Sequence, residues 1–355
     1  MKFSLCIGAL AAISGVAADT SNPPIRNIYT FPPNHFIENI AVRANGRLLI
    51  TSMSVPQLFS IDPTVATPTA EVVHTFSNIT GISGIAEISP DVFALVTATW
   101  DLASTRAELG SIRIWKVDFR RGPGGPGPGP GPATTASSSS PTISLLATVA
   151  NSISFNGIAR HPTNPRLLLA ADSALGAVWR VDLETGAYGV AFQSEVLAPV
   201  GTEPGTNLGI NGLKGEGGHV YFTNSARRFF GRVGIDGAGN RVGEVEVISG
   251  SADAGADVVY DDFALDGKPG KGGGGGARAW IASHPSYAVE VTFGGSGGGP
   301  ASQRVVNDTA LLLNPTAAAF GRGSRLQERT LYVTNGGEFV GFDLVNEGVV
   351  AIDLS

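Results

Sequence analysis

The sequence predicts an all-β chain folded as a six-bladed β-propeller, with the ring closed by pairing of its N- and C-terminal strands. One unit, made of a small-residue strand, an apolar strand and an alternating strand, recurs six times. The second residues of the six units are 39, 84, 157, 212, 262 and 317, so the units are 45, 73, 55, 50 and 55 residues apart. Repeats near this length, built from short strands and turns, are typical of propeller blades. The alternative is a β-sandwich or two smaller β domains.

Residues 155–186 show the unit most clearly: FNGIARHPTNPRLLLAADSALGAVWRVDLETG. Turn-forming residues separate three stretches with strand periodicity, which indicates an antiparallel meander. The first strands are expected at 38–41, 83–86, 156–160, 211–214, 261–264 and 316–319. The second and third strands are expected at 47–52 and 57–62, 92–100 and 111–119, 166–171 and 177–183, 219–225 and 231–236, 278–284 and 287–293, and 330–335 and 348–354.

Each blade also needs a fourth, outer strand. Candidates follow the first five units, at 70–76, 143–149, 189–196, 244–249 and 303–308. The sixth unit ends at the C-terminus without one. We expect residues 27–31 (NIYTF) to complete it, because that pairing would close the ring and remove exposed sheet edges.

The N-terminal segment and the long spacing between the second and third units have simple interpretations. Residues 1–18, with Lys2, an apolar run and a small-residue end, predict a signal peptide and hence a secreted or vesicular protein in the secretory pathway. Residues 19–355 are expected to form one propeller. The Gly/Pro/Ser-rich stretch 121–141 explains the spacing of 73 residues and is expected to be disordered. The only cysteine, Cys6, lies in the predicted signal peptide, so no disulfide is expected.

Charge and motifs narrow the classes of partner. The net charge is −6 and Lys and Arg form no cluster, which argues against nucleic acid. No stretch is long and apolar enough to predict a membrane span. The sequons at Asn78 and Asn307 fit glycosylation on a secretory route.

In a propeller, the first strands line a central channel, and the loops between second and third strands gather at one mouth. Here the first strands begin with polar residues: Glu38, Asn39, Ser83, Asn156, Asn211, Asp261, Asp262 and Thr316. They are turn formers, plugs of the channel or members of a functional site. The loops toward the mouth carry Trp100, Asp172, Asn224, Arg228, Phe229, His284, Tyr287 and Asn335. Trp100 and Phe229 also suit packing between blades.

The unit NGIA…LLLAADS…VWRVDLETG resembles the gluconolactonase/SMP-30-like propellers, over nearly the whole mature chain. Related calcium-dependent lactonases, including the paraoxonases, hold a channel metal with a Glu, two Asn and an Asp-Asn pair. This resemblance implies possible calcium ligands at Glu38, Asn156, Asn211 and Asp261, and oxygen atoms suit such a cation. The chain departs from the paraoxonases at Ser83, where they place a catalytic histidine, and at Asp262, the second half of the pair.

The chain is more similar to secreted fungal members of this group, through NIYTFPPNHFIENIAVRANGRLLITS and NPTAAAFG…TLYVTNGG. Some of these are hetero-Diels–Alderases of tropolone sesquiterpenoid biosynthesis. The resemblance implies dehydration of a hydroxymethyl tropolone to a quinone methide and its cycloaddition with a humulene-type alkene, with no cofactor required. We expect catalytic roles for His284, Tyr287, Arg228 and Asp262. Contacts with a hydrophobic substrate are expected from Asn39, Ser83, Trp100, Asp172, Asn224, Phe229 and Asn335.

Three functions therefore remain open from the sequence. A pericyclase would keep its activity in a chelator. A calcium-dependent lactone hydrolase would lose it with EDTA or with Glu38→Gln. A non-catalytic propeller would bind a ligand or protein without turnover.

Overall fold

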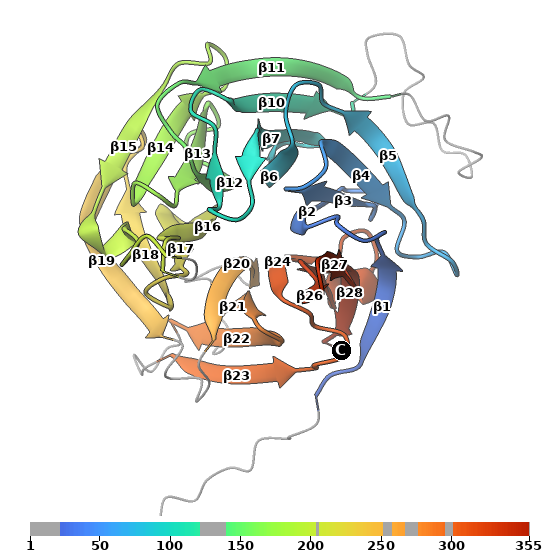
Figure 1. Ribbon diagram of the computed structural model, residues 1–355. Helices are drawn as coiled ribbons and strands as arrows, with labels where there is room; N and C mark the ends of the chain where they lie inside the picture. Colours follow the sequence, from blue (N-terminus) through green and yellow to red (C-terminus); the bar gives the residue numbers. More distant parts are fainter. Residues whose placement is uncertain are drawn as a thin grey trace, which may run out of the picture.

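Six four-stranded antiparallel sheets surround a central channel (Figure 1). The computed structural model describes residues 22–120, 140–203, 206–250, 258–266, 276–294 and 301–354. The predicted signal peptide (1–18) and most of the predicted disordered insertion (121–141) lie outside these residues. The prediction of an all-β, six-bladed propeller is confirmed.

Blades one to five each take four strands that follow one another along the chain, apart from a short hairpin in blade two. Blade one is β2 (Ile37–Val42), β3 (Leu48–Ser52), β4 (Gln57–Ile61) and β5 (Ala70–Thr75). Blade two is β6 (Gly81–Ser89), β7 (Val92–Ala98), β10 (Ile112–Asp118) and β11 (Thr142–Val149). Its hairpin is β8 (Trp100–Asp101) and β9 (Arg106–Ala107). Blade three is β12 (Phe155–Arg160), β13 (Leu167–Asp172), β14 (Ala177–Asp182) and β15 (Tyr188–Gln193).

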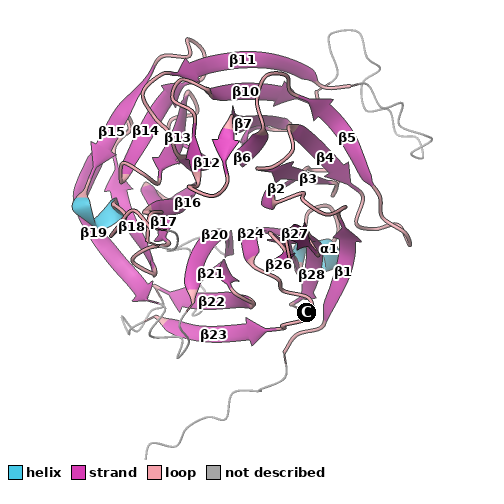
Figure 2. Ribbon diagram, viewed as in Figure 1, coloured by secondary structure: helices cyan, strands magenta, loops and turns pink. Residues whose placement is uncertain are grey.

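The remaining blades follow the same plan. Blade four is β16 (Ile210–Glu216), β17 (His219–Asn224), β18 (Phe229–Ile235) and β19 (Arg241–Gly250). Blade five is β20 (Val259–Asp266), β21 (Ala277–His284), β22 (Tyr287–Phe293) and β23 (Ser302–Asn307). The 3-10 turn η1 (Glu195–Leu197) and helix α1 (Arg325–Glu328) are the helical elements of the described residues (Figure 2).

Blade six joins the two ends of the chain. It consists of β24 (Pro315–Phe320), β25 (Thr330–Asn335), β28 (Gly348–Asp353) and β1 (Ile25–Thr30). β1 pairs antiparallel with β28, and Ile25 lies opposite Ile352. A hairpin of β26 (Glu338–Val340) and β27 (Asp343–Val345) extends between β25 and β28. The predicted closure of the ring is confirmed, and it leaves no open edge between the first and last blades.

The core lies between neighbouring blades, and the alternation of each strand explains why. In β13, Leu168 and Ala170 belong to the apolar cluster shared with blade two. Leu169 and Ala171 belong to the cluster shared with blade four. A strand that is apolar on both faces is expected where both faces of its sheet are covered. Each Leu that is fully buried in this way stabilises the fold by about 1.5–3 kcal/mol.

Candidate functional site at the channel mouth

The mouth is the end of the channel where the first strands begin and the second strands end. Each first strand has an irregular register with its second strand at its predicted polar residues. In blade five, for example, the register shifts between Tyr260 and Phe263, so that Asp261 and Asp262 are unpaired. Such bulges redirect side chains out of the usual alternation. The bulges therefore explain how consecutive polar residues come to lie around one channel, inside the ring of β2, β6, β12, β16, β20 and β24 (Figure 1).

Glycines at three bulges let neighbouring first strands approach closely. A Cβ atom at Gly157 would lie 2.6 Å from the carbonyl oxygen of Asn211. At Gly212 it would lie 2.4 Å from Oδ1 of Asp262. A Cβ does not fit at such distances without displacing the neighbour. The NG pairs of the sequence are thus required by the narrow channel, and they place Asn156, Asn211 and Asp262 around it.

Three carboxyl groups lie close together in the channel, and we call Glu38, Asp261 and Asp262 the carboxyl centre. Glu38, Asp261 and Asp262 are all buried. Burial raises the pKa of Glu38 well above its ordinary value, and the charges of Asp261 and Asp262 raise it further. Burial also raises the pKa of Asp261, although His284 opposes the shift. Like charges held out of water favour the protonated form, or a bound cation. The negative charges of these buried carboxyl groups therefore favour binding of a proton or a cation between them.

Asp262 is held by partners from two other blades. Its Oδ1 accepts a 2.6 Å hydrogen bond from Nζ of Lys214 and one of 2.7 Å from its neighbour, the amide of Phe263. Its Oδ2 accepts a 3.0 Å bond from Nδ2 of Asn39. Lys214 also lies 5.3 Å from the centre of the Phe263 ring. With these contacts Asp262 forms a fixed polar bridge inside the channel, and Lys214 is a member that the sequence analysis missed.

His284 lies at the mouth, as its loop position predicted. It ends β21, and its Nε2 lies 3.1 Å from Oδ2 of Asp261. The side chain is 31% exposed, against 12% for Asp261, so the ring lies between solvent and the carboxyl centre. A carboxylate on one imidazole nitrogen fixes the tautomer and leaves the other nitrogen for proton transfer. His284 can therefore hold or move a proton at Nδ1.

Two carboxamide oxygens near this centre lack a partner. Oδ1 of Asn156 and Oδ1 of Asn211 are buried without a hydrogen bond, whereas Nδ2 of Asn211 donates to Ser225. Buried polar atoms without a partner are uncommon in folded proteins, so each calls for an explanation. With the carboxyls of Glu38 and Asp261, they make a set of oxygen donors that suits a hard cation. No group of three or more His, Cys, Asp or Glu in the described chain is arranged to hold a metal by itself. A cation here would thus depend on the two amides.

Several predicted substrate-binding residues have structural partners. Ser83 donates to the carbonyl of Phe155 in the next blade (2.9 Å). Asp172 accepts from Ser152, from the indole of Trp179 and from two backbone amides of its own turn. Asn224 donates to the carbonyls of Val196 and Ala198 and accepts from the amide of Arg227. These bonds hold the loops in place, and contact of the three side chains with a substrate stays a prediction.

The predicted aromatic residues are mostly part of the core. Phe229 is 7% exposed and packs edge-to-face against Phe222. Trp100 is 8% exposed and belongs to the cluster between blades two and three. Tyr287 is half-buried at the start of β22 and packs on the core of blade five. The interpretation as packing between blades accounts for these positions, and their role toward a substrate stays a prediction.

Two other predicted residues lie toward the mouth, one on a loop and one at the end of a strand. Arg228 is half-buried, with a left-handed backbone (φ 56°). Asn335 ends β25, and its Nδ2 donates to the carbonyl of Leu311 (2.6 Å). It lines a pocket of about 230 Å³ beside the β26–β27 hairpin. The described hydrogen bond of Asn335 is therefore made with its own surroundings and not with the carboxyl centre.

Exposed apolar side chains are concentrated around the mouth. Eight large ones lie on its loops: Leu102, Leu109, Leu175, Val196, Val200, Phe339, Val340 and Phe342. Among the described residues, only Val65 on a loop and Leu326 in α1 lie on the opposite face, and the remaining exposed apolar residues are on blade strands. Phe342 is the most exposed of all. We call these eight residues the apolar rim. A polar centre inside an apolar rim suits an apolar ligand that bears a few polar atoms. Sequence reasoning missed the rim because it depends on which loop residues the fold leaves uncovered.

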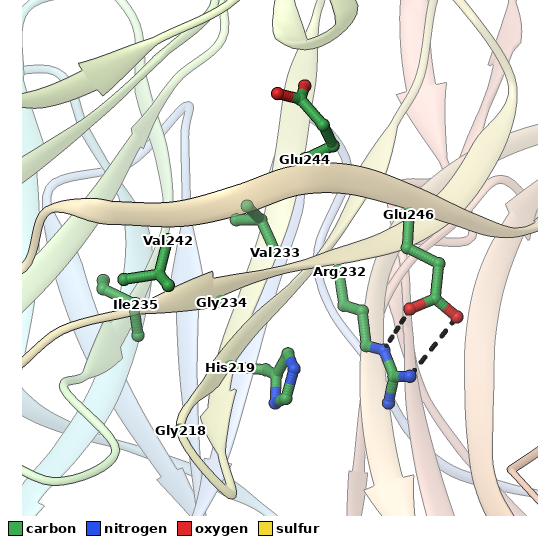
Figure 3. Close-up of a pocket in the computed structure, with 9 residues that line it drawn as sticks. All are labelled: Gly218, His219, Arg232, Val233, Gly234, Ile235, Val242, Glu244 and Glu246. Atoms are coloured by element: carbon green, nitrogen blue, oxygen red, sulfur yellow. Dashed lines mark hydrogen bonds and ion pairs between the residues drawn. The ribbon is translucent and has the colours of Figure 1, made fainter.

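A separate pocket of about 330 Å³ lies in blade four, at the opposite end of the strands (Figure 3). It is lined by residues that include His219 at the start of β17 and Ile235 at the end of β18. Two of its charged groups pair with each other, since Arg232 donates to both carboxylate oxygens of Glu246. It contains none of the predicted site residues.

No protein-family model matches the chain. The chain is 24% identical to a "putative hetero-Diels-Alderase", asR5 of Sarocladium schorii, over 286 residues that cover 74% of this chain and 67% of the relative. It is 25% identical to a "putative hetero-Diels-Alderase" of a Phoma species over 333 residues, which cover 88% and 86%.

Solved structures share the fold. Regucalcin of Agrobacterium tumefaciens, described as a calcium-binding protein, has a TM-score of 0.56 and 14% identity, with 91% of each chain covered. The allergen Mala s 1 of Malassezia sympodialis has a TM-score of 0.61 and 10% identity, with 94% and 97% covered. The described residues contain no helix long and apolar enough to cross a membrane. The chain is thus a distant homologue of the "putative hetero-Diels-Alderases", with a six-bladed propeller that resembles regucalcin.

Proposed function

We propose that this chain is an enzyme of the hetero-Diels-Alderase type, which acts on hydrophobic metabolites at the channel mouth. The observation that carries the proposal is the mouth itself, where loops with exposed apolar residues lie at the same end of the channel as the His284–Asp261 pair. Homology to two proteins described in the same terms supports it. The substrates proposed are a hydroxymethyl tropolone and a humulene-type alkene.

The proposed reaction has two stages. First, the C–O bond of the hydroxymethyl group breaks and the ring hydroxyl loses its proton, so that water leaves and a quinone methide remains. His284 would transfer this proton through Nδ1, with Asp261 holding its other nitrogen. Second, the four-atom C=C–C=O unit adds across the alkene and forms one C–C and one C–O bond. The apolar rim would hold the two reactants together, which removes much of the entropic cost.

The other predicted catalytic residues would act around these groups. Asp262, with Lys214 and Asn39 bound to its carboxylate, would hold a fixed charge arrangement beneath the substrate. Arg228 and Tyr287 would serve as hydrogen-bond donors to the carbonyl, because a donor there stabilises the developing charge. The test is to incubate the purified chain with the two reactants in EDTA. A product ratio different from the spontaneous one supports the proposal, and an identical ratio and rate would refute it.

A calcium-dependent lactone hydrolase is the second candidate, favoured by the unpartnered oxygens of Asn156 and Asn211. Together with Glu38 and Asp261 they would hold the ion, which would polarise a carbonyl or activate water when bound. Glu38 would then be ionised, and His284 would be placed to accept a proton. Hydrolysis of aliphatic lactones that starts with Ca²⁺ and stops with EDTA would support this candidate. If the chain still changes the ratio of cycloadducts when EDTA is present, a bound ion would have only a structural role.

The location of the protein stays a proposal based on residues 1–18. Asn78 and Asn307 are both exposed, so the two sequons are accessible on the folded chain. Mass measurement of protein secreted by a eukaryotic host, before and after removal of N-glycans, would test both the cleavage and the glycosylation.

A further inference from the structure

An arginine that has no role in the proposed reaction lies at the channel mouth. Arg106 belongs to the loop between β7 and β10 of blade two, residues 99–111, which we call the arm. The amide of Ala107 donates a 2.8 Å hydrogen bond to the carbonyl of Ile153, so the arm lies along the segment that leads into β12. That strand carries Asn156 two residues after Ser154. Arg106 therefore lies beside the channel, although its place in the sequence is outside every predicted strand start.

The arm joins three blades at this arginine. One terminal nitrogen of Arg106 donates to the backbone carbonyl of Asn207, in the loop that enters blade four (2.8 Å). The other lies 3.4 Å from Oγ of Ser154 in blade three and 3.4 Å from the carbonyl of Thr105. In return, Nδ2 of Asn207 donates to the carbonyl of Ser104 and to the hydroxyl of Thr105. All three acceptors around the guanidinium are thus uncharged, and they come from the arm itself, from blade three and from the loop that enters blade four.

The charge of this arginine is left without an ion pair. Several arginines of the described chain pair with a carboxylate, as Arg43 does with Asp91 at 2.7 Å. Arg106 forms no such pair among the described residues. Asp172 is the nearby carboxylate, but its two oxygens are taken by four donors of its own blade. Burial lowers the pKa of Arg106, and Asp172 opposes that shift. A half-buried cation of this kind gains most from an anionic partner.

We propose that Arg106 binds the oxygens of a planar organic ligand that carries two neighbouring oxygen atoms with negative charge between them. Nε forms no hydrogen bond with the described residues, and both bonds of one terminal nitrogen are long at 3.4 Å. A guanidinium presents two parallel N–H groups that match such an oxygen pair. Leu102 and Leu109 of the arm and Leu175 of the next mouth loop are exposed and suit the apolar part of the ring. This site rests on the proposed function, since it names what would bind the ring at the mouth.

The probe is tropolone itself, whose ring carries a carbonyl next to an acidic hydroxyl. Tropone lacks that hydroxyl and serves as the matched control ligand. Titration followed by calorimetry compares the unaltered chain with Arg106→Lys, Arg106→Gln and Arg113→Gln. Arg113 lies on β10 close to the same loop and bonds the carbonyl of Ser111 rather than a carboxylate.

We expect Arg106→Lys to weaken tropolone binding by roughly tenfold and Arg106→Gln by more, because a charge-assisted pair of bonds is lost. Arg113→Gln should bind within about twofold of the unaltered chain, and tropone should bind weakly to all four. Unchanged tropolone binding in Arg106→Gln would overturn the site, as would an equal loss in Arg113→Gln.

Two further measurements separate recognition from folding and from the proposed function. Asn207→Ala releases the arm but keeps the guanidinium, so a loss of binding equal to that of Arg106→Gln, with the same drop in thermal midpoint, would overturn direct recognition. Arg106→Lys keeps the stem and the charge, and it carries the test if Arg106→Gln does not fold. Tropolone binding that depends on Arg106, without any cycloadduct from the full reactants, would refute the proposed function while confirming this site.

Discussion

Nδ2 of Asn39 donates a 3.0 Å hydrogen bond to Oδ2 of Asp262, and it thereby connects blade one with blade five across the channel. These blades are not neighbours, because blade six lies between them (Figure 1). Lys214 of blade four binds the other oxygen of the same carboxylate. One buried aspartate thus ties together three blades at the level of the candidate site, and its removal should affect the stability of the whole ring.

We expect Lys214→Met to destabilise the fold by about 3 kcal/mol, because it leaves the buried carboxylate of Asp262 without its cation. The double variant Lys214→Met/Asp262→Asn should recover part of that loss. Arg120→Gln is the control, since Arg120 and Asp118 form an exposed pair at 2.6 Å whose loss should cost less than about 1 kcal/mol. Denaturant unfolding measures all three. An equal cost at Lys214 and Arg120 would contradict the bridge.

The raised pKa of Glu38 predicts a pH dependence of stability. Between its ordinary value of 4.5 and its raised value, the folded chain holds a proton that the unfolded chain has lost. The free energy of unfolding should therefore fall as pH rises through this window. Glu38→Gln removes this contribution, so the variant should gain stability relative to the unaltered chain as pH rises. Unfolding in EDTA at pH 4 to 8 measures the difference, and a difference that shrinks with pH would show the opposite sign.

Calcium should stabilise the chain if the donor set of the channel binds it. At a Ca²⁺ concentration 100 times the Kd, we expect the free energy of unfolding to rise by about 2.7 kcal/mol. Asn156→Ala and Glu38→Gln should lose this gain, whereas Asp182→Asn, at a half-buried carboxylate that ends β14 and bonds the amide of Glu184, should keep it. Thermal unfolding with and without EDTA is the measurement. An equal rise in all variants would place the ion elsewhere.

Substitution of two phenylalanines should distinguish a residue that packs in the core from one that contacts the ligand. Phe229→Ala should destabilise the fold by about 3–5 kcal/mol, because the side chain is buried against Phe222. Phe342→Ala should change stability by less than about 0.5 kcal/mol, since nothing covers this side chain in the described chain. In the cycloaddition assay we expect Phe342→Ala to raise the KM for the hydrophobic reactants. An unchanged KM would remove the hairpin from the binding surface.

The fold could be predicted from local signals because each blade repeats them. The polar residue that starts each predicted first strand, such as Asp261, and the turn after each strand are visible in the sequence, and the missing outer strand of the last blade predicts pairing with 27–31. The predicted strand 92–100 is too long: it divides into β7, which ends at Ala98, and the arm, which carries Trp100 away from that strand.

The site could be predicted only in part, for a physical reason. Residues at strand starts share a place in every blade, so repetition identified Glu38, Asn156, Asn211 and Asp261. Lys214 reaches the centre from further along a strand, and Arg106 reaches the mouth through a loop that crosses to another blade. Such contacts depend on tertiary geometry and leave no periodic signal. Conversely, Asn224 and Asp172 have the expected residue types, but their hydrogen bonds hold the protein's own loops. Asn224 donates to the carbonyl of Val196 in the preceding connection, and Asp172 accepts from the amide of Leu175 in its own turn.

The ratio of stereoisomeric cycloadducts formed in EDTA tests the central claim most directly. The unaltered chain should shift this ratio and the rate away from those of the spontaneous reaction. Leu109→Ala/Phe342→Ala, which changes only exposed rim residues, should move the ratio back toward the spontaneous one while the thermal midpoint stays unchanged. A ratio that is identical with the unaltered chain, with the variant and with no protein would contradict the proposed activity.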